Sequence, residues 1–204
     1  LGASEDSEQI SFSLNQIKKF NQISSVFDKE IGYTIKKHIL NTSGILNFSE
    51  YQFDMVRSGI GLYGFGNDPK YTNILKPVIS LKTVISQIQE IKKGQSVGYN
   101  KGFTAGKTTK SATLPIGHAD GISRSYGNGN GKVLINGSFA KIIGNVCMDM
   151  LMVDVTNISC KEGDQVIIFN DTSFSAEEFA STIETISYEI LTALSSRIRR
   201  VVIK

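Results

Sequence analysis

The sequence predicts an α+β chain in which a shorter α/β segment precedes a β-rich domain of roughly 130 residues. Apolar residues recur at helical spacing near the start, whereas short β-type runs dominate after residue 77. The 204 residues suffice for a sizeable core, and the composition (40% hydrophobic, 20% charged) is ordinary for a globular protein. The net charge of +3 with scattered basic residues argues against a nucleic-acid partner. No apolar run is long enough to span a membrane.

The first segment reads as helix, strand, helix and strand. Ser13 with Gln16 forms a capping-box pattern ahead of a helix that Gly32 is expected to end. The apolar residues of that helix recur at helical spacing: Leu14, Ile17, Phe20, Ile23 and Phe27. Residues 33–40 predict a strand, 49–55 a short helix and 56–63 a second strand. A strand–helix–strand unit with short loops predicts that its two strands run parallel.

Residues 66–76 predict a linker, because Gly, Asn, Asp and Pro occur there without periodicity. The β-type runs that follow lie at 78–91, 112–116, 133–135, 139–143, 151–155 and 166–169. Asn136-Gly137 between two of these runs is a strong signal for a tight type I′ hairpin. Two helices are expected next, one capped by Ser175 with Glu178 and one over residues 188–194. Residues 199–203 predict a closing strand.

Two turns in the first segment are candidates for phosphate binding. His38 precedes Asn41-Thr42-Ser43-Gly44, where backbone amides and hydroxyls beside a helix start suit a phosphate group. An ordinary strand-to-helix turn is the alternative. Arg57 and Gly59 at the next strand form a second candidate of the same kind. Two neighbouring loops of this kind strengthen the phosphate interpretation until it is about as well supported as the ordinary turn.

Several single residues could carry chemistry, each with a structural alternative. Tyr99 is a possible acid or base, or a half-buried aromatic. His118 in Gly117-His118-Ala119-Asp120-Gly121 is a possible base, or a structural histidine. Cys147 could be a nucleophile or a buried, unreactive thiol. Met148 could contact a ligand or belong to the core. Tyr188 could bind a phosphate or pack in the core. Cys147 and Cys160 lack metal-type spacing, so we expect free thiols in a cytoplasmic protein and no metal site.

Together these runs resemble the alanine racemase family of pyridoxal-phosphate enzymes. The resemblance rests on several motifs in the family's order: Asn41-Thr42 after His38, Arg57-Ser58-Gly59-Ile60-Gly61-Leu62-Tyr63-Gly64, Tyr99, Cys147-Met148-Asp149 and Thr185-Ile186-Ser187-Tyr188-Glu189. It implies a fold of two parts. Residues 1–75 would be the last segments of an incomplete (β/α)8 barrel that binds pyridoxal 5′-phosphate. Residues 76–204 would form a C-terminal, mainly-β, barrel-like domain.

The resemblance also implies roles for individual residues. Tyr99 would be a catalytic base, and Arg57 would face the pyridine nitrogen with His38 as its hydrogen-bonding neighbour. The implied ligands of the cofactor phosphate are Asn41, Thr42, Gly59, Ile60 and Tyr188. The substrate site would be lined by Cys147, Met148 and Asp149.

The implied activity is interconversion of L- and D-alanine for peptidoglycan precursors. In the family, the tyrosine and the Cys-Met-Asp segment reach the cofactor of the other subunit, which implies a homodimer with shared sites. One alternative is a related barrel-type racemase for serine or another amino acid. A second alternative is a non-catalytic dimerisation module.

The sequence departs from the family in two places. His118 stands where the family usually has tyrosine, which changes the hydrogen bonds near the substrate entrance. The Lys-x-x-Ala-Tyr-Gly-type motif, whose lysine anchors the cofactor and serves as the second base, has no match. The chain also begins without Met, and we expect an excised or processed piece.

These 204 residues alone are therefore predicted not to racemise alanine, because the covalent anchor and one base are missing. The assay is D-alanine formation by the purified chain supplied with pyridoxal phosphate and L-alanine. Measurable D-alanine above a protein-free blank would contradict the prediction.

Overall fold

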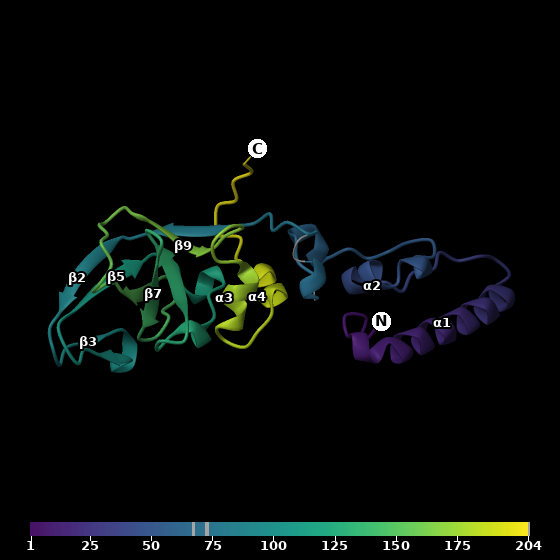
Figure 1. Ribbon diagram of the computed structural model, residues 1–204, viewed down its shortest axis with the longest axis horizontal. Coiled ribbons are helices and arrows are strands. Elements are labelled where there is room, and N and C mark those ends of the chain that lie inside the picture. The colour runs from purple at the N-terminus through teal and green to yellow at the C-terminus, as the bar shows by residue number, and fades with distance from the viewer. Residues whose placement is uncertain (67, 72–73, 204) are drawn as a thin grey trace. The chain divides into compact units, whose positions relative to one another are not determined.

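The computed structural model describes residues 1–66, 68–71 and 74–203. The chain forms two compact units, Leu1–Val78 (unit 1) and Ile79–Lys204 (unit 2), shown in Figure 1. Part of the predicted linker, at positions 67, 72 and 73, lies outside the described residues. None of the helices in the described part of the chain has the length and apolar character to cross a bilayer.

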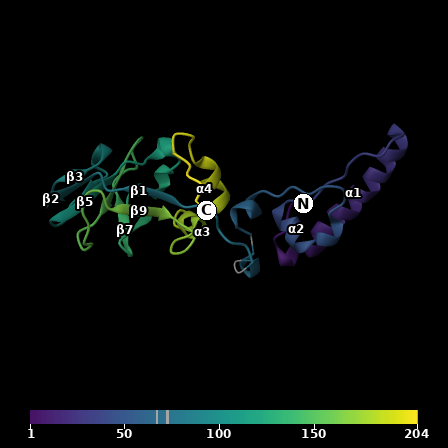
Figure 2. The same cartoon turned by 90° about the horizontal axis from the view of Figure 1, so that it is seen from above.

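Unit 1 contains two α-helices, α1 (Ile10–Ile31) and α2 (Thr42–Asn47). Single 3₁₀ turns occupy Ser7–Gln9, Ser49–Tyr51, Ile60–Tyr63 and Pro69–Tyr71. Its small core consists of the buried side chains Ile17, Leu40 and Phe48. Figure 2 shows the ribbons of α1 and α2. Gly32 ends α1 with φ of +74°, as predicted. The predicted start at Ser13 is wrong, since α1 begins one turn earlier and Ser13 is buried inside it.

The two strands predicted in unit 1 are not formed. Residues 33–40 and 56–59 are irregular, and the predicted helix at 49–55 is reduced to one 3₁₀ turn. The two segments nevertheless run side by side in the same direction, because Asp54 N donates to Lys37 O and Arg57 N donates to Leu40 O. Two such bonds do not make a ladder, and β-type sequences need neighbouring strands to become regular. The predicted parallel direction is thus present without the predicted strands.

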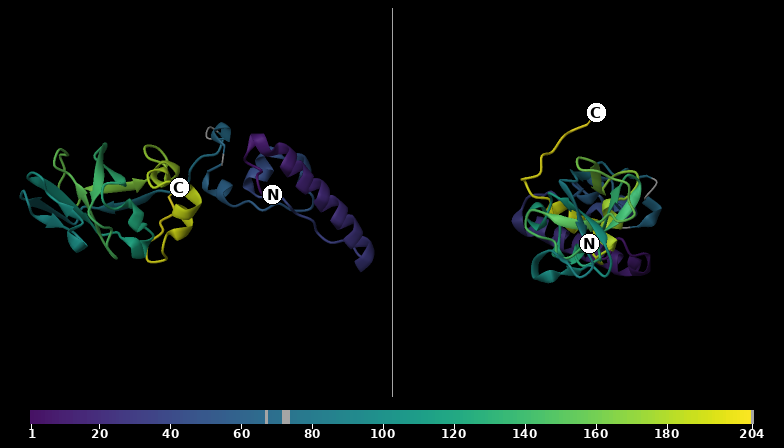
Figure 3. Two further views of the ribbon diagram at one scale, coloured as in Figure 1. Left: turned by 90° about the horizontal axis from the view of Figure 1, so that it is seen from below. Right: turned by 90° about the vertical axis from the view of Figure 1, so that its left-hand side faces the viewer.

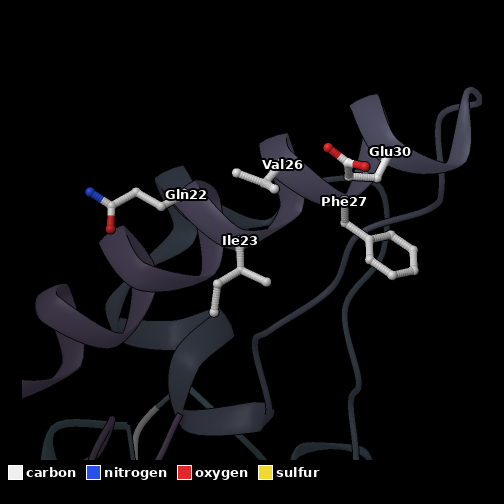
Figure 4. A pocket seen from close by; sticks show the side chains of 5 residues that line it. All are labelled: Gln22, Ile23, Val26, Phe27 and Glu30. Atoms are coloured by element: carbon white, nitrogen blue, oxygen red, sulfur yellow. The ribbon is translucent and has the colours of Figure 1, made fainter.

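Helix α1 has a second group of apolar side chains that remain exposed in the described part of unit 1. Figure 4 shows Ile23, Val26 and Phe27 around a shallow hollow, with Gln22 and Glu30 beside them. The three apolar residues are each about half exposed or more. A contiguous apolar patch of this kind is typical of a contact surface.

Unit 2 is built on a curled seven-stranded antiparallel sheet in the order β1-β9-β6-β7-β8-β5-β2. Its strands are β1 (Leu81–Val84), β2 (Gln87–Ile91), β5 (Thr109–Leu114), β6 (Lys132–Ile135), β7 (Ser138–Ile143), β8 (Leu151–Asp154) and β9 (Gln165–Phe169). Each overlaps a predicted β-type run, but the single run predicted at 78–91 is divided into β1 and β2, and β5 begins before its predicted start at residue 112. A separate pair, β3 (Ser96–Val97) with β4 (Phe103–Thr104), was not predicted. Short 3₁₀ turns lie at Tyr99–Lys101, His118–Asp120 and Arg124–Tyr126.

The predicted hairpin between β6 and β7 is confirmed. Ile135 pairs with Ser138, and the two turn residues Asn136 and Gly137 have φ of +47° and +77°. Both values suit a type I′ turn, whose twist matches that of the strands it joins.

Helices α3 (Ala176–Ser181) and α4 (Ser187–Ala193) lie beside the sheet (Figure 3), and the predicted capping box of Ser175 with Glu178 is present. The core between α3 and the sheet is aromatic. Tyr126 is fully buried, stacks on Phe179 at 4.0 Å and donates a hydrogen bond to its carbonyl oxygen. The predicted closing strand at 199–203 is wrong, because these residues are irregular and exposed. Their apolar side chains have no strand beside them in the described residues.

The pKa of Tyr126 is raised well above its ordinary value of 10.0, first by burial and then by Glu189. The unfolded chain therefore loses this proton near pH 10 while the folded chain keeps it. We expect the free energy of unfolding to fall above pH 10, with a slope from this residue approaching about 1.4 kcal/mol per pH unit. Tyr126→Phe should lack that slope.

Urea titrations between pH 7 and 11.5 measure this difference. At pH 7 the variant should be less stable by about 1 kcal/mol because of the lost hydrogen bond, and the gap should close as pH rises. Tyr99→Phe is the control, since Tyr99 lies in the same unit and is 75% exposed. Parallel pH curves for wild type and Tyr126→Phe would refute the assignment.

Candidate functional site

Unit 1 brings the two predicted phosphate-binding turns together at Thr42. Thr42 is the first residue of α2 and is buried, and its Oγ1 accepts hydrogen bonds from Gly59 N at 3.0 Å and Gly61 N at 3.4 Å. A Cβ at position 61 would lie 2.9 Å from Thr42 Cγ2, which only glycine avoids without a shift. A hydroxyl has two acceptor positions and one proton, so these N–H groups leave the Thr42 proton to be donated elsewhere.

We call the arrangement of Thr42 Oγ1 with the N–H groups of Gly59 and Gly61 the Thr42 cradle. Asn41 and Ile60 have structural roles beside it. The Asn41 side chain caps α2, accepting from Gly44 N at 2.9 Å and from Ser4 Oγ at 2.9 Å. Ile60 is buried at the start of the 3₁₀ turn that follows Gly59. The Gly59 N–H already donates to Thr42 Oγ1, so in this structure it is used within the cradle.

Arg57 and His38 are in direct contact, as predicted. Arg57 Nη1 lies 2.8 Å from His38 Nδ1. A guanidinium only donates, so Nδ1 accepts and the ring proton resides on Nε2. Arg57 is exposed and His38 half-buried, and their contact leaves the remaining guanidinium N–H groups of Arg57 for other acceptors.

Unit 2 places Tyr99 beside the Cys147-Met148-Asp149 segment. The two border an open cavity of about 400 Å³, together with Gly98, Met150 and Met152. Tyr99 is 75% exposed and Met148 59% exposed, so both side chains project from the surface. Tyr99 is not on a strand; it occupies a 3₁₀ turn that follows β3.

The segment 147–150 is fastened by the backbone of the run that contains His118. His118 N donates to Cys147 O at 2.9 Å, and Ala119 N donates to Met148 O at 3.0 Å. A Cβ at Gly117 would lie 2.4 Å from Cys147 O, so this close approach requires glycine. The imidazole of His118 is exposed, and the contacts that hold the segment come from its backbone.

Arg197 completes the site and is not among the residues that the sequence predicted. Its Nη2 donates to Asp149 Oδ1 at 2.7 Å, and its Nε lies 3.5 Å from Asp120 Oδ1. The other Asp120 oxygen accepts from Gly117 N. The hydrogen bond that Arg197 donates to Asp149, and then the charges of Asp120 and Asp149, raise the pKa of Arg197. We call the contacts of Arg197 with Asp149 and Asp120 the Arg197 clamp. No sequence signal links residues 48 positions apart, so only the fold reveals it.

Tyr188 lies in the first turn of α4 and is half-buried. It belongs to unit 2, whereas Thr42 and Arg57 belong to unit 1. Its implied role in phosphate binding therefore stays a prediction.

Comparison with known proteins identifies two family domains in the chain. The family described as "Alanine racemase, C-terminal domain" matches residues 78–202, and "Alanine racemase, N-terminal domain" matches residues 2–67. The alanine racemase of Helicobacter pylori strain P12 is 42% identical, covering 93% of this chain and 53% of the relative. Alanine racemase 1 of Clostridium acetobutylicum is 35% identical, covering 99% and 54%. The chain spans about half the length of these relatives.

Solved structures agree with the sequence relatives. Alanine racemase from Bartonella henselae with covalently bound pyridoxal phosphate has a TM-score of 0.85 at 32% identity, covering 98% of this chain and 54% of that one. Alanine racemase from Streptomyces coelicolor has a TM-score of 0.86 at 28% identity, covering 98% and 53%. The fold of both parts, an incomplete barrel segment and a β domain, is thus confirmed.

Loss of the Arg197 clamp should loosen segment 147–150 and expose the Cys147 thiol. We expect Arg197→Met to react with a thiol reagent about two- to fivefold faster, because an exposed ion pair contributes modestly. The measurement uses Cys160→Ser as the background, so that Cys147 is the reporter. Arg199→Met is the matched control, since Arg199 contacts neither aspartate. Equal rates in all three proteins would show that the clamp does not restrain the segment.

Proposed function

The chain belongs to the alanine racemase family, and on that basis we propose that it contributes the phosphate cradle and a substrate wall to an enzyme that interconverts L- and D-alanine. The cofactor would be pyridoxal 5′-phosphate, and the product would supply peptidoglycan precursors. The observation that carries the proposal is the pairing of the Thr42 cradle with the Arg57–His38 contact in one unit.

The residues of unit 1 fit pyridoxal phosphate chemically. A Cβ at Gly59 would lie 3.9 Å from Thr42 Oγ1. A side chain at position 59 would therefore occupy space next to this hydroxyl, and a phosphate bound to the hydroxyl would need that space. We propose Thr42 as a phosphate donor, with Asn41, Gly59 and Ile60 shaping the cradle and Tyr188 as a further ligand. Bound pyridoxal phosphate supplies an electron sink for the charge left on the substrate α-carbon.

Arg57 would face the pyridine nitrogen of the cofactor. Two adjacent cations repel each other, so Arg57 would keep that nitrogen unprotonated. His38 accepts one guanidinium N–H and so fixes the direction of the others. This arrangement would weaken the electron sink that the cofactor supplies and so would limit side reactions at the α-carbon.

Tyr99 would move a proton at its phenolic oxygen on one face of the substrate, since racemisation removes the α-proton from one face and returns it to the other. Cys147, Met148 and Asp149 would form the wall beside it. The carboxylate of Asp149 is engaged by Arg197, and the remaining wall side chains are mostly apolar. Met148, Met150 and Met152 give this wall apolar side chains that suit the methyl group of alanine.

We further propose a cytoplasmic homodimer. Both cysteines are free thiols, in keeping with a reducing compartment. Tyr99 and Met148 project outward beside an open cavity, which suits a site completed by a partner subunit. A non-catalytic dimerisation module would need neither the Thr42 cradle nor the Arg57–His38 contact.

Two variants of the complete racemase that carries these residues test the proposal. Tyr99→Phe should lower kcat by about 10²- to 10⁴-fold, the usual contribution of a general base, and leave cofactor affinity unchanged. Thr42→Val should weaken cofactor binding by about tenfold through loss of one charge-assisted hydrogen bond, with kcat near normal at saturation. D-alanine formation and titration with pyridoxal phosphate measure the two effects.

Each variant is the other's control, because one should change kcat and the other cofactor affinity. Both substitutions nearly preserve the side-chain volume, so neither should disturb the fold. If the wild-type enzyme binds pyridoxal phosphate but does not racemise alanine, the assignment of alanine as its substrate is refuted. Cofactor affinity unaffected by Thr42→Val would refute the cradle.

A further inference from the structure

The backbone around Tyr99 is held in an unusual conformation. Gly98, Asn100 and Lys101 have φ of +78°, +57° and +50°, all in the left-handed region. Such values are unfavourable for Asn and especially for Lys, and they persist only where surrounding contacts impose them. The segment 98–102 therefore depends on an external support.

The support is the side chain of Asn145, which lies in the loop between β7 and β8. Its Nδ2 donates to the carbonyl oxygen of Tyr99 at 2.9 Å. Its Oδ1 accepts from Asn128 Nδ2 at 3.2 Å. A carbonyl can only accept, so the amide nitrogen of Asn145 must face Tyr99, and its oxygen is left for Asn128. The two bonds fix one orientation of the Asn145 amide.

The backbones on either side are packed closely enough to make this contact specific. A Cβ at Gly102 would lie 3.0 Å from both N and Nδ2 of Asn145. Gly144 has φ of +65°, and a Cβ there would lie 3.0 Å from Val97 O. The half-buried Asn145 is thus packed closely against Gly102 at the end of the Tyr99 turn.

Asn145 also contacts the opposite wall of the cavity. Cys147 Sγ donates to Asn145 O at 3.6 Å, a weak hydrogen bond. One residue therefore connects the Tyr99 turn with the Cys147-Met148-Asp149 wall, and both border the same cavity.

We propose that Asn145 is a positioning residue that sets the placement of Tyr99 relative to this wall. The proposal rests on the proposed function of Tyr99 as the proton-transferring group. Asn145 touches the backbone of Tyr99 and not its phenol, so it acts on where the phenolic oxygen lies. A displacement of about 1 Å at such a group is enough to lower a rate by about a hundredfold.

The first test uses the 204-residue chain and needs no activity. Backbone amide hydrogen exchange of residues 97–104 should become at least about tenfold faster in Asn145→Ala, because the turn loses its support. Asn145→Asp keeps the shape but turns a carboxylate oxygen toward the Tyr99 carbonyl, so it should have a similar effect. Asn130→Ala is the matched control, since Asn130 Nδ2 donates to a different carbonyl, Ser125 O. Unchanged exchange in both Asn145 variants would overturn the proposal.

The second test uses the complete enzyme with alanine deuterated at the α-carbon. Poor placement of Tyr99 slows only the proton transfer made by Tyr99. Asn145→Ala should therefore lower kcat by about ten- to a hundredfold with a smaller change in KM. The primary isotope effect should rise for the enantiomer whose α-proton Tyr99 removes, and it should fall for the other enantiomer, to which Tyr99 only returns a proton.

A rise for both enantiomers or for neither, with faster exchange, would mean a merely structural role and would overturn the positioning assignment. If the wild-type enzyme does not racemise alanine, the proposed function fails by itself. The exchange experiment still decides whether Asn145 holds the Tyr99 turn.

Discussion

The arrangement of unit 2 depends on the backbone pairing of β7. Residues 138–141 of this strand pair with β6, and residues 142–143 pair with β8, so one strand joins the two halves of the curled sheet. The loop that carries Asn145 and the Cys147-Met148-Asp149 wall follows directly. Because β7 is paired on both sides, the first residue of that loop is placed by ladder hydrogen bonds. The site thus continues directly from a strand that pairs with two neighbours in the sheet.

The sequence predicted unit 2 well and unit 1 poorly, and the difference has a physical cause. Each β-type run of unit 2 up to residue 169 finds an antiparallel neighbour in the same unit, so local preference and pairing agree there. The predicted strands at 33–40 and 56–63 have only a few bonds to each other, and their β preference is not satisfied by a sheet. Residues 199–203 fail for the same reason. Strand formation is decided by partners that a local pattern does not contain.

The site shows the same division. The contact between Arg57 and His38 could be predicted, because the resemblance placed both residues on neighbouring segments. Arg197 and Asn145 could not, because their importance comes from bonds to residues about 48 and 46 positions away. Charge and amide side chains of this kind are common on protein surfaces, so composition gives no reason to single them out. Motifs identify the groups that react, whereas the fold identifies the groups that hold them.

His118 illustrates how a departure from a family pattern can be judged physically. The resemblance places a tyrosine at this position, which at first suggests a changed site. The contacts that fasten segment 147–150, however, come from the backbone N–H groups of His118 and Ala119 and from the glycine before them. Any non-proline residue at position 118 supplies the same N–H. The exchange of tyrosine for histidine therefore preserves the wall and alters only an exposed side chain, where the shorter imidazole changes hydrogen bonding at the surface.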